Sequence, residues 1–258
     1  MWGKAKESLA LVDAAVARRV DVTSDQYRYP ASSTGFRAVF PRWALDGGGD
    51  AIRARLRDPA QRARVKEGIV YAMINERGGN DPAQVVLADC AWDPSLNGLN
   101  LAQLLQRRKL DVTIGNAAEL IMDLEDAGGC QCVYHAMSDE DVDMIMLHPR
   151  TMIGSDGGVV VPGPLRPHPR YYGTFPRVLG RYVRERGLLS LQLAIHKMTR
   201  MPADRLGITD RGRIEVGAIA DIAIFDPETI IDKATFEEPN QYAEGVLHVF
   251  VNGVAVLL

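Results

Sequence analysis

The sequence lacks most of the features that would assign it to a class of protein at first sight. Three cysteines among 258 residues are too few for a disulfide framework, so we expect a reducing compartment and predict a cytoplasmic protein. No apolar run approaches the ~18 residues of a membrane-spanning helix, and residues 1–4 do not resemble a signal peptide. A net charge of −3 gives no basis for a nucleic-acid or membrane partner. The composition, with 47% hydrophobic and 24% charged residues, is that of an ordinary soluble protein.

Short motifs for metal binding and nucleophilic catalysis are also missing. The sequence has no HxH, HExxH or CxxC pattern, and neither GxSxG nor GxGxxG occurs in a suitable context. Cys130 and Cys132 form a CxC pair, but two thiols do not make a metal site, and we interpret both as buried core residues. The histidines are scattered, and we assign no ligand role to any of them.

The patterns that are present indicate an α/β protein. Apolar residues spaced three and four apart predict an N-terminal helix, and alternation predicts a strand within 18–27. The helical stripe consists of Trp2, Ala5, Leu9, Val12 and Val16, and Val20 and Val22 share one strand face. Further strands are expected within 83–90, 130–137 and 151–153, and helices at 100–110, 114–129 and 138–149. The last of these helices has Ser138 as its N-cap, which explains the acidic residues of its first turn without a metal.

The C-terminal segment differs from this α/β body. Apolar residues alternate around glycine turns in "GRIEVGAIADIAIFD" (212–226), and "LHVFVNGVAVLL" (247–258) consists of two apolar runs joined by Asn252-Gly253. An Asn-Gly pair between alternating runs is the strongest short signal for a β-hairpin. We therefore predict a small all-β domain over 209–258, after a larger α/β domain over 1–208.

Asp156 is the most conspicuous candidate for chemistry. It follows the strand at 151–153 in the turn "GSDGG", and a carboxylate near a buried strand end is usually paired or catalytic. The alternative is that Asp156 only caps the following turn through its own backbone.

Several segments resemble, in order, the N-acyl-D-amino-acid deacylases (D-aminoacylases) of the amidohydrolase superfamily. These segments are "ESLALVDAA" (7–15), "DVTSDQYRYPASST" (21–34), "HAMSDEDV" (135–142), "TMIGSDG" (151–157), "HPRYYGTFPRVLGRYVRERGLL" (168–189), "KMTRMPADRLGITDRGRIEVGAIADIAIFDPETI" (197–230), "DKATFEEP" (232–239) and "VFVNG" (249–253). The resemblance implies the C-terminal part of a metal-dependent-hydrolase (β/α)8 barrel, with a long insertion at about 30–137 and a small β-sandwich tail.

The resemblance also implies roles for individual residues. Asp156 would end the eighth barrel strand as the catalytic acid and base, at the strand end where barrel enzymes carry their reactive groups. Arg170 in "HPR" would clamp the carboxylate of the substrate, Tyr27 and Ser33 would hold the same end of it, and Met137 would face its side-chain pocket. Without the resemblance, Tyr27 and Met137 would be interpreted as core residues and Arg170 as a member of a surface ion pair.

The metal ligands of the family lie on strands that have no counterpart here. We therefore expect zinc in the complete enzyme, its ligands in an N-terminal half that is missing from this chain, and little or no zinc in this chain alone. The expected partner is a small molecule, an N-acyl-D-amino acid. Two alternatives stay open, namely a hydantoinase- or dihydroorotase-like enzyme acting on cyclic amides, and a non-catalytic remnant of half a barrel. A carboxylate clamp argues against the first alternative.

Overall fold

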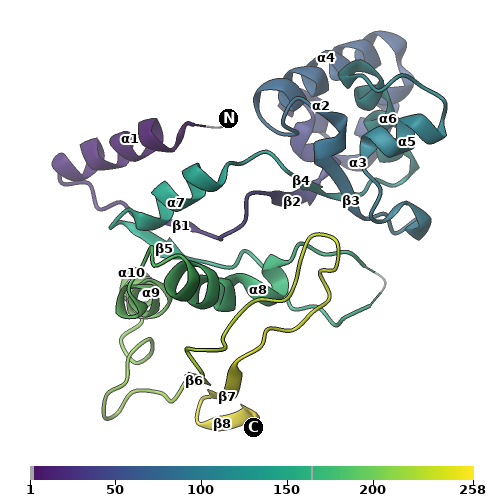
Figure 1. Cartoon of the computed structure of the whole chain (residues 1–258). Helices are drawn as coiled ribbons and strands as arrows, with labels where there is room; N and C mark the ends of the chain where they lie inside the picture. Colours follow the sequence, from purple (N-terminus) through teal and green to yellow (C-terminus); the bar gives the residue numbers. More distant parts are fainter. Residues whose placement is uncertain (1–2, 164) are drawn as a thin grey trace. The chain divides into compact units, whose positions relative to one another are not determined.

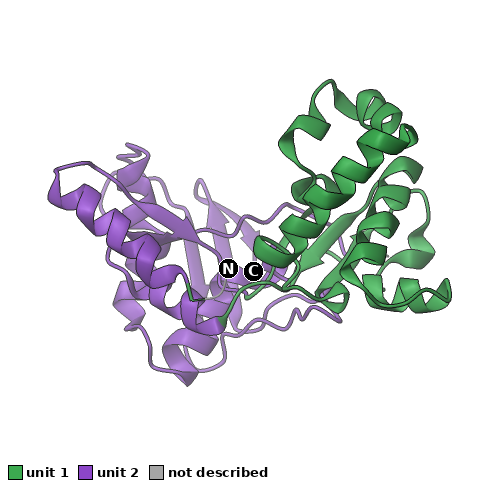
Figure 2. Cartoon of the chain, turned by 90° about the horizontal axis from the view of Figure 1, so that it is seen from above, with its two compact units in different colours: residues 1–3, 30–138, 163–168 green, residues 4–29, 139–162, 169–258 purple. Residues whose placement is uncertain are grey.

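The computed structural model describes residues 3–163 and 165–258, which divide into two structural units (Figure 2). Among the described residues, unit 1 contains Gly3, 30–138, 163 and 165–168, and unit 2 contains 4–29, 139–162 and 169–258. Unit 1 has nearly the same bounds as the insertion predicted at about 30–137. That this unit is inserted into a (β/α)8 barrel stays a prediction.

Unit 1 is built on an antiparallel sheet with the strand order β2-β4-β3 (Figure 1). Its strands are β2 (Ser32–Gly35), β3 (Val85–Asp89) and β4 (Gln131–Tyr134), and its α-helices are α2 (Arg42–Leu45), α3 (Gly48–Arg57), α4 (Pro59–Asn75), α5 (Leu101–Arg107) and α6 (Ile114–Ala127). Short 3-10 turns lie at η1 (Phe36–Val39), η2 (Pro82–Gln84) and η3 (Pro94–Leu96). The helix ends follow local chemistry: the Asp58 carboxylate accepts the first N–H groups of α4, and Gly128 ends α6 with a positive φ of 142°.

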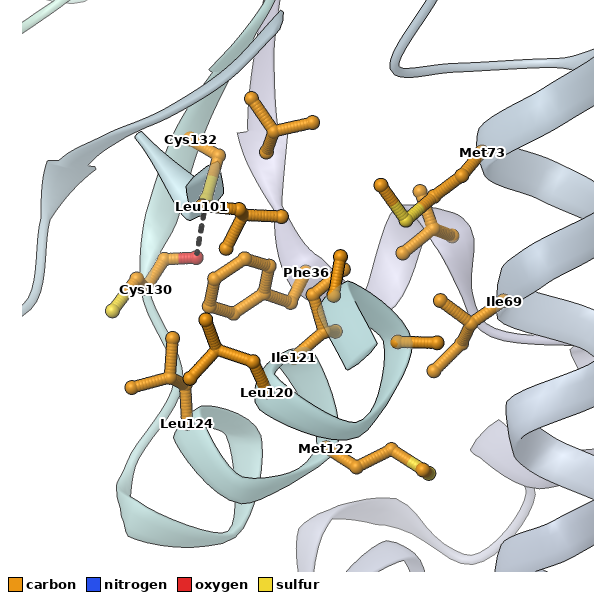
Figure 3. Packing of buried hydrophobic residues seen from close by; sticks show 14 of the residues in the cluster. Phe36, Ile69, Met73, Leu101, Leu120, Ile121, Met122, Leu124, Cys130 and Cys132 are labelled. Atoms are coloured by element: carbon orange, nitrogen blue, oxygen red, sulfur yellow. Dashed lines mark hydrogen bonds between the residues drawn. The ribbon is translucent and has the colours of Figure 1, made fainter. Parts of the chain in front are cut away.

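The core of unit 1 lies between the sheet and helices α4, α5 and α6. Phe36 is fully buried beside Leu101 and Ile121, and Met73 and Ile69 approach from α4 (Figure 3). Burying side chains of this size stabilises the unit by roughly 1.5–3 kcal/mol each relative to exposure. These contacts give unit 1 its own hydrophobic core.

Cys130 and Cys132 are buried core residues as predicted, but the expectation of reduced cysteines is wrong for one pair. Cys90 and Cys130 form a disulfide with an S–S distance of 1.99 Å, and only Cys132 is a free, buried thiol among the described residues. The pairing of β3 with β4 brings Asp89 opposite Gln131, so the adjoining cysteines also meet, although 40 positions separate them in the sequence. Because disulfides are typical of oxidising compartments, the cysteines no longer support a cytoplasmic location.

Unit 2 contains a parallel strand pair and most of the remaining helices. Strand β1 (Ser24–Gln26) pairs with β5 (Thr151–Ile153), and α1 (Ala5–Ala17) packs against α7 (Asp139–Leu147) (Figure 1). The chain continues through α8 (Arg170–Arg177), the π-helical η4 (Val178–Glu185), α9 (Leu191–Met198) and α10 (Arg200–Arg205). The core of this unit includes Ile153, Val178, Tyr182 and Ala194.

The N-terminal predictions for unit 2 are partly right. Helix α1 covers the predicted stripe from Ala5 onward, whereas Trp2 lies outside the described residues. A strand lies within 18–27 as predicted, but it is limited to Ser24–Gln26, so the placement of Val20 and Val22 on a strand face is wrong, and Val20 is 49% exposed. Only three residues pair with β5, so alternation alone overestimated the length of the strand.

The C-terminal sheet has the order β6-β7-β8, with β6 (Ile222–Phe225), β7 (Val246–Val251) and β8 (Val254–Leu257). Asn252 and Gly253 join β7 to β8 with φ angles of 52° and 77°, so the predicted hairpin is confirmed as a turn of type I′. No helix in the described part of the chain combines the length and the apolar character needed to cross a bilayer.

Candidate active site

Asp156 lies in the turn that follows β5. Its φ of 47° is in the left-handed region, which Asp tolerates better than most residues, and its side chain is 70% exposed. The carboxylate is therefore at the surface of unit 2, whereas an acid at a buried strand end was expected. Gly157 follows, and a Cβ there would lie 3.1 Å from the Tyr171 Cα, so the turn packs closely onto the start of α8.

Arg170 is the first residue of α8 and is only 6% exposed. Its Nη2 atom lies 3.0 Å from the Asp156 Oδ2 atom, and its guanidinium carbon lies 4.7 Å from the centre of the Tyr27 ring. A second tyrosine, Tyr171, lies 6.0 Å from the same guanidinium. Cation–π contacts of this kind and the carboxylate together orient the planar guanidinium. Unit 2 thus brings together Tyr27, Asp156 and Arg170, which the sequence separates by up to 143 positions.

A second ion pair, which is buried, lies next to these residues. Arg177 Nη1 is 2.9 Å from Asp232 Oδ2, with side-chain exposures of 12% and 5%. Tyr29, which is 1% exposed, donates its hydroxyl to the same carboxylate oxygen at 3.3 Å. Burial and the Asp232 charge raise the pKa of Tyr29 far above its usual value, so the phenol stays protonated. Burial lowers the pKa of Arg177, but the charge and hydrogen bond of Asp232 outweigh this and raise it overall. None of these three residues was predicted from the sequence to have a role.

Ser33 and Met137 belong to unit 1. Ser33 is the second residue of β2 and pairs in register with Val133 of β4, and Met137 follows β4, where its N–H donates to the Pro30 carbonyl at 3.2 Å. Both are half-buried and lie where β2 begins and β4 ends. Their roles toward a substrate stay predictions.

Two of the histidines make structural contacts within their units. His168 is fully buried with Nε2 3.0 Å from the Ala31 carbonyl oxygen, and His148 lies 3.1 Å from Asp13. His196 lines a surface groove of about 820 Å³ beside α9 and α10, where Asp204 pairs with Arg200 and Arg213. Because the charges of this groove satisfy one another, it is a poorer candidate site than the Asp156 turn.

The described side chains of this chain do not by themselves provide a suitable set of metal ligands. Within residues 3–163 and 165–258, no three His, Cys, Asp or Glu side chains lie close enough together to hold a metal. A catalytic zinc site uses about three protein ligands, and here Asp156 contributes one carboxylate that already pairs with Arg170. We therefore derive no chemical step through a metal held by this chain.

Comparisons with protein families, curated sequences and solved structures all find similarity to amidohydrolases. Residues 140–257 match the amidohydrolase family model. Over 99% of its length the chain is 36% identical to N-acyl-D-glutamate deacylase and 34% identical to D-aminoacylase, both from Alcaligenes xylosoxydans xylosoxydans. Among solved structures, it is similar to N-acyl-D-glutamate deacylase from Bordetella bronchiseptica complexed with zinc and a phosphonate inhibitor that mimics the tetrahedral intermediate. The identity is 32%, the TM-score is 0.73, and the match covers 99% of this chain and 44% of that protein.

The fold is thus of the amidohydrolase type. More specifically, the chain matches a C-terminal portion of N-acyl-D-amino-acid deacylases, which confirms the resemblance noted in the sequence. The chain spans 42% of the length of each of these two curated relatives.

Proposed function

We propose that this chain serves in the hydrolysis of the amide bond of N-acyl-D-amino acids, as the C-terminal part of a deacylase. The observation that carries the proposal is the 3.0 Å contact between Asp156 and Arg170. In an N-acyl-α-amino acid, the carboxylate and the amide nitrogen are attached to the same carbon atom. The protein group that binds the substrate carboxylate and the group that transfers a proton to the amide nitrogen must therefore be neighbours, as Arg170 and Asp156 are.

Each residue then has a defined task. Arg170 binds the substrate carboxylate through its planar fork, and Tyr27 supports the guanidinium from one face. Asp156 accepts a proton from the attacking water as the new carbon–oxygen bond forms. It donates this proton to the amine nitrogen as the carbon–nitrogen bond breaks. The exposure of Asp156 allows water and substrate to reach it, and the burial of Arg170 strengthens its attraction for a carboxylate.

The complete protein would add what this chain does not contain. A zinc ion bound in the complete protein would lower the pKa of a water molecule and polarise the amide carbonyl, and its ligands would come from the part of the relatives that the chain does not span. In that protein β1 and β5 would be the last two strands of a (β/α)8 barrel, unit 1 would be an insertion between them, and the C-terminal sheet would belong to a β-sandwich. Ser33 would bind the carboxylate end of the substrate, and Met137 would line its side-chain pocket.

The test uses the chain co-expressed with the complementary N-terminal part of a related deacylase. We expect Asp156→Asn to lower kcat by at least ~10²-fold with little change in substrate affinity, the scale for loss of a general acid–base group. Asp210→Asn, which changes an exposed loop acid of the same unit, is the matched control and should leave kcat unchanged. Turnover of Asp156→Asn at the level of this control would exclude Asp156 as the acid and base.

A further inference from the structure

Behind the Asp156–Arg170 pair lies the buried group formed by Tyr29, Arg177 and Asp232. We propose that these three residues form a positioning network that fixes the two sides of the carboxylate clamp, Tyr27 and Arg170. The inference rests on the proposed function of the clamp, because the network itself touches neither the substrate nor the reacting atoms.

The network holds the Tyr27 side of the clamp through the backbone. Arg177 Nε donates to the carbonyl oxygen of Arg28 at 2.9 Å, and Arg28 is the residue between Tyr27 and Tyr29. The guanidinium of Arg177 also lies 4.6 Å from the centre of the Tyr29 ring. The segment that follows Tyr27 is therefore held by one side chain at two adjacent residues, through the backbone of Arg28 and the ring of Tyr29.

The network holds the Arg170 side through the start of α8. The Tyr29 hydroxyl lies 3.4 Å from the carbonyl oxygen of Pro169, the residue directly before Arg170. Gly173, three residues into the helix, packs on the same hydroxyl so closely that a Cβ there would approach it to 2.5 Å. That Cβ would also lie 2.8 Å from the Asp232 Cβ, so α8 has no room to shift toward the network.

A single carboxylate oxygen joins both sides. Asp232 Oδ2 accepts hydrogen bonds from Tyr29 and from Arg177, and both acceptor and donors are almost completely buried. A buried pair of this kind is costly to break singly, because the remaining charge is left unpaired. The network is therefore rigid, and a clamp depends on rigidity, since misplacing a binding group by about 1 Å costs on the order of 10²-fold in rate.

The competing explanation is that the three residues only attach the segment 230–236 to unit 2. Phe236 packs edge-on against Tyr29 at 6.1 Å and Ala234 is buried, which such attachment would also require. The two explanations differ in one respect. Attachment alone predicts a loss of thermal stability, whereas positioning predicts a change in the contact between Arg170 and Tyr27.

The experiment observes Arg170 directly in the 258-residue chain. In protein labelled with ¹⁵N-arginine, the Nε–Hε signal of Arg170, assigned from its loss in Arg170→Lys, reports the ring current of Tyr27. We expect Asp232→Asn and Tyr29→Phe to shift or broaden this signal. The matched control is Tyr182→Phe, which also removes a buried tyrosine hydroxyl, here one without a hydrogen-bond partner among the described residues. This control should leave the signal in place.

An unchanged Arg170 signal in both network variants would overturn the inference, whatever happens to their melting temperatures. Tyr29→Phe keeps the ring and its packing, so it decides the question even if Asp232→Asn does not fold. A shift of the same size in Tyr182→Phe would also overturn it, because the effect would then be general.

A titration separates this inference from the proposed function. N-acetyl-D-alanine should move the Arg170 signal of the wild-type chain, and N-acetyl-D-alaninamide, which lacks the carboxylate, should not. We expect Asp232→Asn to weaken the response to the carboxylate by about tenfold. If the wild-type chain responds to neither probe, the proposed carboxylate clamp is wrong, and the comparison of variants still decides whether the network positions Arg170.

Discussion

Arg28 provides the sharpest prediction about stability, because it is a fully buried cation whose three guanidinium nitrogens find no hydrogen-bond partner among the described residues. Burial lowers the pKa of Arg28 to about 9, and the charge of Asp143 offsets this only in part. Asp143 is itself paired with Arg186. We therefore predict that Arg28→Met stabilises unit 2, although most substitutions of buried residues destabilise a protein.

The magnitude follows from the pKa. The drop from the usual arginine value to about 9 corresponds to an upper bound of roughly 5 kcal/mol, at about 1.4 kcal/mol for each pH unit. Methionine fills a similar volume with a flexible apolar chain, and replacing buried charges by apolar residues stabilises proteins by about 1–4 kcal/mol. We expect a gain in this lower range. The matched variant is Arg177→Met, which should cost about 3–5 kcal/mol because it leaves the buried Asp232 carboxylate unpaired.

Urea unfolding followed by circular dichroism at pH 7 measures both variants, and the transition of unit 1 serves as an internal reference. The pH dependence gives a second measurement. Because the pKa of Arg28 is lower in the folded chain, the unfolded chain binds more protons above pH 9, and wild-type stability should rise there with increasing pH. In Arg28→Met this part of the rise should be absent. If Arg28→Met unfolds as easily as Arg177→Met, Arg28 has a stabilising partner and the reasoning is wrong.

Three further predictions concern the site and the cysteines. In the complemented enzyme, Arg170→Ala should lower kcat/KM for N-acyl-D-amino acids by about 30- to 900-fold, which corresponds to a loss of roughly 2–4 kcal/mol of transition-state binding. The kcat/KM for an N-acyl amine without the carboxylate should hardly change, and an equal loss for both substrates would make Arg170 structural. Cys90→Ser should lower the unfolding free energy of unit 1 by about 2–4 kcal/mol in oxidised protein and should hardly change it in reduced protein. Equal effects on this free energy in both states would argue against the Cys90–Cys130 bond. The dialysed 258-residue chain should carry well under one zinc by elemental analysis and show no deacylase activity. Tightly bound stoichiometric zinc with hydrolysis of an N-acetyl-D-amino acid would contradict the expectation that the zinc ligands lie outside this chain.

Features determined by neighbouring residues could be predicted from the sequence. The Asn252-Gly253 turn, the end of α6 at Gly128 and the strand before Asp156 depend on a few adjacent residues, and all three agree with the structure. The prediction that Val20 lies in a strand is wrong for a physical reason. Its alternation with Val22 is a valid strand pattern, but β5 offers hydrogen bonds only to the three residues that begin at Ser24.

Features that depend on distant residues could not be predicted in this way. The Cys90–Cys130 bond requires the register between β3 and β4, and the contact between Asp156 and Arg170 requires the turn after β5 to fold back onto α8. The resemblance supplied roles for Asp156 and Arg170 because their motifs are specific, but it carried no information about their distance. Asp232 lies in "DKATFEEP", which was noted as part of the resemblance without a role for its first residue.

Arg177 could have been found by helical spacing. It lies seven residues after Arg170, two turns along α8, and residues at this interval share one face of a helix. The arginine of the clamp and the arginine of the network therefore share one face of α8, and Gly173 between them allows the close approach of Tyr29. The spacing does not show whether a buried arginine binds a ligand, stabilises the fold or destabilises it. This depends on the group that faces the guanidinium, which differs among three arginines of this unit. Arg170 meets an exposed carboxylate and is suited to exchange it for a ligand, whereas Arg177 meets a buried carboxylate and is suited to hold its position. The Arg28 guanidinium has no hydrogen-bond partner among the described residues, so the cost of its burial is offset only in part by nearby charge.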